Sequence, residues 1–133
     1  MTVIAVDTSA LLSIFKGETE GEAWLDLLHT LSRTKSLIVS TIVLGEIRSF
    51  FPSHTTCMKA IQSLYLQVSE LDKDSSLLAG KIFRDYRAKG GPRSTILPDF
   101  LVAAHAVTQA DALATLDRGY LRTYFPKIRL LQP

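Results

Sequence analysis

The chain of 133 residues is 47% hydrophobic and 21% charged, a balance typical of globular proteins and unlike that of disordered ones. Its 15 Lys and Arg against 13 Asp and Glu leave a formal charge of +2, too small to indicate nucleic-acid binding by itself. One cysteine excludes an internal disulfide framework, and no apolar run reaches the roughly 18 residues of a membrane helix, so we expect a cytoplasmic protein without membrane segments.

Strand-sized apolar runs alternate along the chain with segments of helical periodicity. In chain order, the expected elements are a strand at 2–6, helices at 9–16 and 20–33, a strand at 36–41, helices at 42–51 and 55–66, a strand at 66–71, helices at 74–89 and 99–109, and strands at 112–116 and 127–132. Helical crossovers join parallel strands. The order therefore predicts one α/β domain over residues 1–133, with helices on both faces of a five-stranded parallel sheet, a three-layer α/β/α sandwich.

Two acids directly follow predicted strands. Asp7 comes after the first strand and Asp117 after "ALATL". Ligands of open parallel sheets bind beyond the carboxyl ends of the strands, so these positions are candidates for chemistry at one edge of the sheet. For either acid alone, an N-cap or turn role is the simpler interpretation.

A third acid lies within the predicted helix at 42–51. On a helical wheel of about 100° per residue, Glu46 falls inside the apolar arc, while Gly45, Arg48 and Ser49 take the opposite side. A carboxylate on a core-facing stripe needs a partner, a proton or a metal ion. The alternative, of about equal weight, is an acid at the edge of the stripe that reaches solvent or a buried Arg.

A fourth acid, Asp99, opens the apolar helix "LPDFLVAAHA". It shares a face with Val102, Ala103 and Ala106, whose small side chains allow close packing that would carry the carboxylate inward. Following Pro98 in the first turn, it would also complement the helix dipole. Both roles can hold together.

Four such acids suit a hard cation such as Mg²⁺ or Mn²⁺, because these ions take oxygen ligands, whereas zinc sites favour Cys and His. Without an ion, two carboxylates about 5 Å apart would repel by roughly 3 kcal/mol at an effective dielectric of 20. Asp72 and Asp74 are interpreted as helix-start residues. We expect His105 to be a packed or partly exposed ring, and no Ser/His/Asp arrangement is evident.

With these residues in view, the chain resembles PIN-domain proteins, and specifically the small VapC-type toxins of toxin–antitoxin systems. The similar segments are "VIAVDTSALL", "STIVLGEI", "LPDFLVAAHA" and "LATLDRGYLRTYFPKIRLL". The resemblance implies a sheet in the order 3-2-1-4-5 and an endoribonuclease that uses Mg²⁺ or Mn²⁺.

The resemblance also implies roles for individual residues. Its catalytic and metal-binding quartet would be Asp7, Glu46, Asp99 and Asp117. Hydroxyl positions near the metal correspond to Thr8, Ser9 and Thr115, for which local turn and cap roles are the alternative. Some relatives carry a further acid after the last Asp, where this chain has Arg118 and Gly119.

Partners follow from the same resemblance and from charge. The implied partners are RNA, a cognate antitoxin that blocks the acidic pocket, and a second copy in a homodimer. Because acids repel RNA, a basic rim must hold it, with Arg118 the foremost of the candidates. These are Arg48, Arg84, Arg87, Lys89, Arg93, Arg118 and Arg122, and Tyr120 is a candidate for base stacking.

Three rival functions can be weighed on the residues. A receiver-type phosphorylation module would have adjacent acids after the first strand and a Lys after a late strand, and neither occurs. Nucleotide-binding α/β folds would carry GxGxxG or GxxxxGK[ST], which are absent. The alternative that stays open is a catalytically weak PIN-like RNA-binding or scaffold protein.

Overall fold

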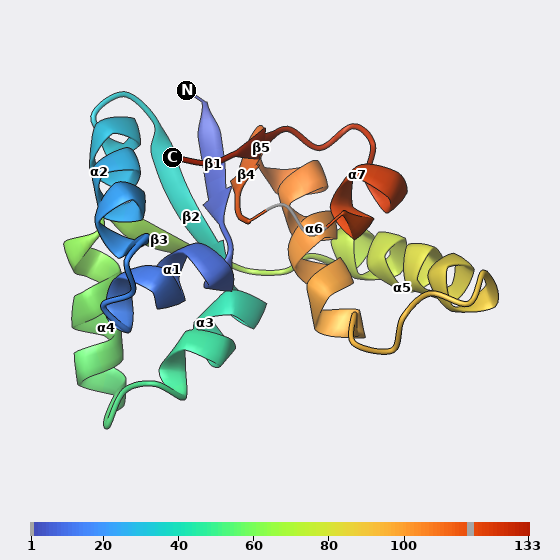
Figure 1. The fold of residues 1–133 in the computed structure, drawn as a ribbon, viewed down its shortest axis with the longest axis horizontal. Helices are drawn as coiled ribbons and strands as arrows, with labels where there is room; N and C mark the ends of the chain where they lie inside the picture. The colour runs from blue at the N-terminus through green and yellow to red at the C-terminus, as the bar shows by residue number, and fades with distance from the viewer. Residues whose placement is uncertain (1, 117–118) are drawn as a thin grey trace.

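The predicted sheet is present. The structure, a computed structural model, describes residues 2–116 and 119–133. Within them, one parallel sheet runs in the order β3-β2-β1-β4-β5, which confirms the expected order (Figure 1). Its strands are β1 Val3–Val6, β2 Ser36–Ser40, β3 Leu66–Ser69, β4 Ala112–Ala114 and β5 Leu130–Leu131. The carboxyl ends of β1, β2 and β4 consequently lie side by side.

Helices cover both faces of this sheet, so the three-layer arrangement is also confirmed. They are α1 Thr8–Phe15, α2 Gly21–Ser32, α3 Thr41–Arg48, α4 His54–Ser63, α5 Lys73–Ala88, α6 Leu97–Gln109 and α7 Tyr120–Tyr124. Figure 1 shows α1, α2 and α4 on one side of the strands and α5, α6 and α7 on the other. Helix α3 lies at the edge where β1 and β2 end, and it contacts α1, α4 and α6.

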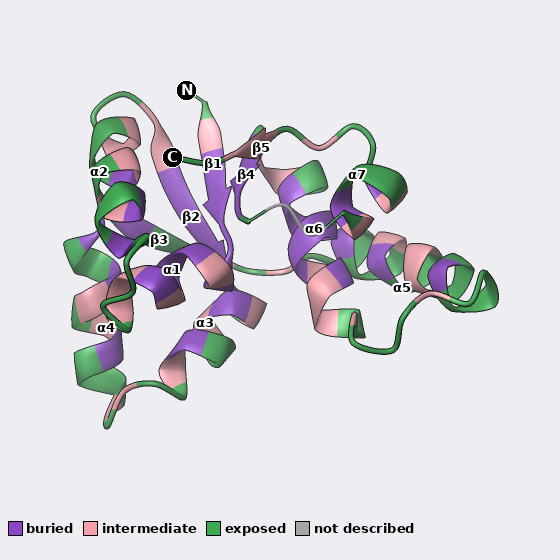
Figure 2. Ribbon diagram, in the orientation of Figure 1, coloured by how far each residue is buried: buried purple, intermediate pink, exposed green. Residues whose placement is uncertain are grey.

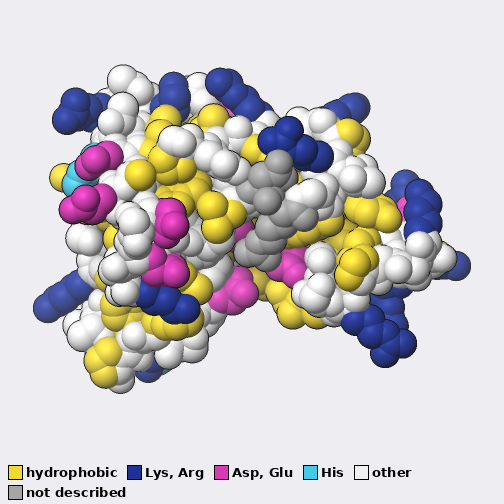
Figure 3. All heavy atoms as spheres, in the orientation of Figure 1, with side chains coloured by type: hydrophobic (Ala, Val, Ile, Leu, Met, Phe, Trp, Pro, Cys, Tyr) yellow, Lys and Arg dark blue, Asp and Glu magenta, His cyan; other side chains and the backbone are white. Residues whose placement is uncertain are grey.

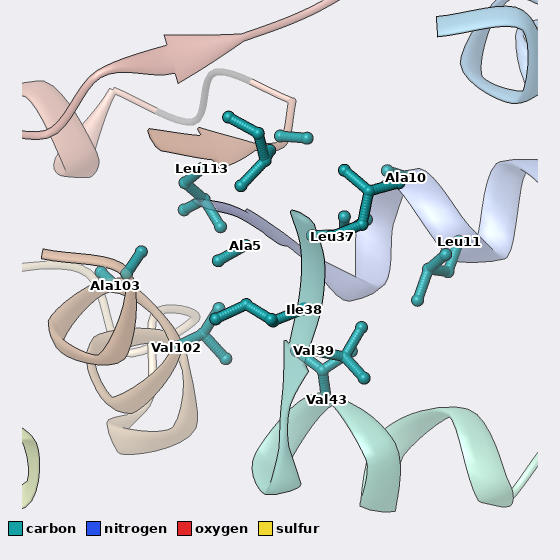
Figure 4. Close-up of a cluster of buried hydrophobic side chains, with 14 of the residues drawn as sticks. Ala5, Ala10, Leu11, Leu37, Ile38, Val39, Val43, Val102, Ala103 and Leu113 are labelled. Atoms are coloured by element: carbon teal, nitrogen blue, oxygen red, sulfur yellow. The ribbon is translucent and has the colours of Figure 1, made fainter. Parts of the chain in front are cut away.

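The central strand β2 shows why the sheet is sandwiched. Its residues Leu37, Ile38 and Val39 are all buried, as expected for a strand covered on both faces. Alternate side chains point to opposite faces. Leu37 and Val39 extend toward the α1 and α3 side and Ile38 toward Val102 of α6 (Figure 4). Figure 2 shows the same burial along the inward sides of the surrounding helices.

Several helices begin at a polar residue that caps them. Asp7, Ser40 and Asp72 each accept a hydrogen bond from a backbone N–H in the first turn of the helix that follows. The predicted helix-start role of Asp72 is thereby confirmed. None of the helices in the described residues is long and apolar enough to cross a membrane.

Some predicted element boundaries were wrong. The helix expected at 42–51 ends at Arg48, and the one expected at 55–66 ends at Ser63. The strand expected at 127–132 is reduced to Leu130–Leu131. Helix α7 was not predicted, because five residues are too few for a helical period to repeat.

Candidate active site at the carboxyl edge of the sheet

Asp7 is both the cap of a helix and a residue at the sheet edge. It directly follows β1 and is only 8% exposed. Its Oδ1 accepts the N–H of Thr8 at 2.8 Å, and its Oδ2 accepts the hydroxyl of Ser9 at 3.1 Å. These bonds hold the carboxylate in one orientation.

Thr115 ties Asp7 to the neighbouring strand. It directly follows β4, which pairs with β1, and its side chain is fully buried. The Thr115 hydroxyl donates to Oδ2 of Asp7 at 2.6 Å, and it also lies 3.4 Å from the Ser9 hydroxyl. Ser9 Oγ in turn accepts the N–H of Leu116 at 3.4 Å. The segment after β4 is therefore fastened to the start of α1 beside the Asp7 carboxylate.

Glu46 joins the same cluster from α3. The hydroxyl of Thr8, next to Asp7 in the chain, donates to Oε1 of Glu46 at 2.8 Å. This contact connects residues that are 38 positions apart. The structure thus brings together Asp7, Thr8, Ser9, Glu46 and Thr115.

Of the two interpretations of Glu46 that the sequence left open, the structure supports an acid at the edge of the stripe that reaches solvent, because the residue is exposed. Only Val43 and Ile47 of α3 are buried, which is a narrower stripe than the wheel indicated. The helix ends at Arg48, so Phe50 and Phe51 do not belong to its wheel and had widened the apolar arc. Glu46 reaches the site from the solvent side of α3.

Asp99 lies in the first turn of α6 and is half-buried. Its Oδ2 accepts the N–H of Ile96 at 2.9 Å, so the predicted helix-start role is confirmed. Val102, Ala103 and Ala106, predicted to share its face, are buried, but so are Ala104 and His105, so burial in α6 extends beyond that face. Helix α6 packs against both β1, which Asp7 directly follows, and α3, which carries Glu46.

Two predicted site residues, Asp117 and Arg118, lie outside the described residues. Among the residues that are described, no three His, Cys, Asp or Glu side chains form a group that could hold a metal ion. The cluster around Asp7 contains two carboxylates and three hydroxyls, so all of its side-chain donors are oxygens. Their chemistry fits a hard divalent cation and not zinc.

A second polar cluster was missed because only acids were sought at the ends of the strands. Ser69, the last residue of β3, has its hydroxyl 3.0 Å from Nε2 of His105, which is 1% exposed. Burial lowers the pKa of His105, and the nearby Asp72 carboxylate opposes this by raising it. Hydrogen bonds from Ser75 lower the pKa of Asp72 itself. Searching the end of every strand for hydroxyls, as for acids, would have found Ser69.

The expectation of a packed or partly exposed His105 ring is confirmed, because the ring is buried. Gln109 Nε2 contacts the Ser69 hydroxyl at 3.4 Å and donates to the carbonyl of Glu70 at 3.0 Å. The Asp72 carboxylate accepts the N–H of Ser75 at 2.7 Å. The Ser75 hydroxyl donates to Oε1 of Gln109 at 3.0 Å. The bonds of Gln109 thus fasten α6 to the end of β3 and the start of α5, which is a structural role.

The predicted basic rim divides into residues with structural contacts and residues on the surface. Arg48 donates to His54 Nδ1 and to the Phe51 carbonyl, both at 2.7 Å, and thereby braces the turn after α3. Tyr120 packs its ring 5.5 Å from that of Phe100. Figure 3 shows acidic side chains near the middle of one face, over α3 and α6, and several Lys and Arg side chains at the far end of α5.

Comparisons with known proteins agree with this fold. A family model described as PIN domain matches residues 4–126. No curated protein sequence matches the chain.

Solved structures do match it. The VapBC2 complex of Rickettsia felis, bound to a DNA fragment from its promoter, has a chain with a TM-score of 0.74 and 18% identity, covering 98% of each chain. VapBC-1 from nontypeable Haemophilus influenzae gives 0.72 and 19%, again over 98% of each. FitAcB from Neisseria gonorrhoeae gives 0.67 and 16% over 96% of each. At these identities the likeness shows a shared fold.

Proposed function

Because this chain belongs to the PIN-domain family, we propose that it is a metal-dependent endoribonuclease, the toxin of a toxin–antitoxin pair. The observation that carries the proposal is a pair of hydrogen bonds at one edge of the sheet, from Thr115 to Asp7 and from Thr8, the neighbour of Asp7, to Glu46 of α3. Oxygen donors gathered at the carboxyl edge of a parallel sheet are what a phosphoryl-transfer site with a hard cation needs.

Four carboxylates would hold Mg²⁺ or Mn²⁺ in this proposal: Asp7, Glu46, Asp99 and Asp117. When bound, the ion would polarise the phosphodiester and lower the pKa of an attacking water. Thr115 and Ser9 orient the Asp7 carboxylate, and Thr8 orients that of Glu46. Arg118 is proposed to contact a phosphate of the RNA backbone.

The proposed protein partner is an antitoxin. It is supported by similar structures whose names describe toxin–antitoxin assemblies, including one from Klebsiella pneumoniae that covers 89% of each chain. A homodimer and a cytoplasmic location belong to the same proposal. Of the apolar pair after α3, Phe51 packs 5.2 Å from Phe15, whereas Phe50 is 48% exposed. Phe50 is thus the residue of this pair that a partner could cover.

Cleavage of a mixed RNA pool by purified protein, free of antitoxin, tests the proposal. We expect cleavage with Mg²⁺ or Mn²⁺, none with EDTA, and a loss of at least 100-fold in Asp7→Asn. Asp26→Asn, at an exposed position of α2, is the matched control and should cleave like the wild type. Cleavage that persists both in EDTA and in Asp7→Asn would refute the mechanism, and a silent wild type would favour the scaffold alternative.

Metal binding can be measured independently of cleavage. An ion that binds only the folded state at 100 times its Kd adds about 2.7 kcal/mol to the free energy of unfolding. We therefore expect Mn²⁺ to raise the melting temperature of the wild type and of Asp26→Asn. A similar rise in Asp7→Asn would show that the ion binds elsewhere.

A further inference from the structure

A pocket of about 560 Å³ lies between the end of α5 and the loop that leads into α6. Its lining includes Arg87 and Arg93, together with Phe83, Thr95 and Ile96. The volume lies within the range of small-molecule sites. The basic rim expected from the sequence includes Arg87 and Arg93, but no role assigned above uses the pocket itself.

The wall of the pocket is held in one shape by Tyr86. The Tyr86 hydroxyl donates to the Pro92 carbonyl at 2.6 Å, and the backbone carbonyl of Tyr86 accepts the N–H of Gly91 at 3.0 Å. The ring lies so close to Gly91 that a Cβ there would collide with it. Gly90 has φ +74°, a conformation that favours glycine. The pocket is therefore formed before any ligand arrives.

This pocket adjoins the candidate active site through three residues of chain. Ile96 lines the pocket, and its N–H donates to Oδ2 of Asp99 at 2.9 Å. A strand of RNA whose phosphate lies at the carboxylates can consequently reach the pocket with an adjacent nucleotide.

The charge of this end of the molecule is positive. Residues 81–95 contain five Lys or Arg and one Asp. Arg87 and Arg93 are exposed, and the Arg87 guanidinium lies 5.7 Å from the centre of the Phe83 ring. Figure 3 shows the dark blue side chains around the far end of α5, away from the acids in the middle of the face. This charge offsets the repulsion that the acids exert on a polyanion.

We propose that the pocket is a nucleotide subsite, in which Arg87 and Arg93 bind the phosphate next to the one that is cleaved. The base of that nucleotide would pack against a guanidinium plane and the exposed side chain of Ile96, as bases of single-stranded RNA do. The inference rests on the proposed ribonuclease function. It adds a path for the RNA strand, which would run from the carboxyl edge of the sheet over the start of α6 to the end of α5.

The test compares Arg87→Gln/Arg93→Gln with the wild type on an RNA that the wild type cleaves. Arg33→Gln is the matched control, because Arg33 is exposed and lies just before β2, at the opposite edge of the sheet. We expect KM to rise roughly ten-fold in the double variant with kcat within about two-fold, because binding outside the reacting phosphate is lost. The control should match the wild type in both.

Salt dependence gives a second readout. In an Asp7→Asn background, the slope of log affinity against log salt should become shallower by about 0.7 when the contact to one phosphate of a single strand is lost. Replacing single phosphates by neutral methylphosphonates should weaken the wild type at one position beside the cleavage site and leave the double variant unaffected there.

The outcomes separate the two proposals. If the wild type cleaves RNA but the double variant has the KM, salt slope and methylphosphonate pattern of the wild type, the subsite is refuted while the ribonuclease stands. If the wild type cleaves no RNA with either metal, the ribonuclease itself has failed.

Discussion

The Thr115 hydroxyl lies 2.6 Å from Oδ2 of Asp7, although the two residues are 108 positions apart in the chain. Each follows a strand, and the strands are neighbours in the sheet. Parallel pairing of β1 with β4 is thus what places a buried hydroxyl against the first carboxylate of the candidate site.

Replacing Thr115 by Val removes that donor at nearly constant volume. A hydrogen bond to a charged group contributes about 1.5–3 kcal/mol, so the Asp7 carboxylate should lose its orientation and the affinity for Mn²⁺ should fall about ten-fold. Titration calorimetry measures this affinity. Thr115→Ser keeps the hydroxyl and should stay close to the wild type, and equal losses in both variants would mean that the methyl group matters instead.

Thr8 should transmit its effect through Glu46. We expect Thr8→Val to reduce RNA cleavage about ten-fold, because Glu46 loses the hydroxyl that holds its Oε1. In Glu46→Ala, adding Thr8→Val should have little further effect, as residues in one hydrogen-bonded network are not additive. Cleavage rates of the two single variants and the double variant form the cycle. Full additivity would contradict the linkage.

His105 should make the protein less stable in mild acid. Burial lowers the pKa of the ring below the 6.5 of the unfolded chain, so protonation favours unfolding. The free energy of unfolding should therefore fall as the pH drops below about 6.5 and on toward the folded-state pKa. Urea titrations from pH 7.5 to 5 measure the trend.

The matched variants are His105→Gln and His29→Gln, the latter at an exposed position of α2. The first should flatten this part of the pH dependence, and the second should keep it because His105 remains. A steep acid loss that survives in His105→Gln would assign it to other groups.

Gly91→Ala should destabilise the chain by roughly 1–3 kcal/mol, because the added methyl group overlaps the Tyr86 ring. Gly80→Ala is the matched control, since a Cβ at Gly80, within α5, has open space around it. That change should stabilise by about 0.5–1 kcal/mol through helix propensity. Denaturant unfolding measures the stability of both variants. Equal changes in the free energy of unfolding would contradict the close contact between Gly91 and the Tyr86 ring.

The sequence by itself determined the succession of strands and helices, apart from the short helix α7, and, with the family resemblance, the order of the sheet. Apolar runs such as "VIAV" and caps such as Asp7 and Asp72 express local preferences, which depend on neighbours in the chain. The position of Asp7 at the carboxyl edge of the sheet also followed from the sequence, because the residue that directly follows a parallel strand lies at that edge.

Only the tertiary structure decided which side chains meet. The exposure of Glu46 depended on where α3 ends and on how narrow a stripe its neighbours cover, so a helical wheel alone could not choose between the two interpretations of this residue. The contacts of Thr115 with Asp7 and of Ser69 with His105 join segments that are distant in sequence. They arise from tertiary packing, and a local sequence pattern does not identify which residues will pack together. The closeness of Tyr86 to Gly91 is likewise a matter of where a ring lies once the core has formed.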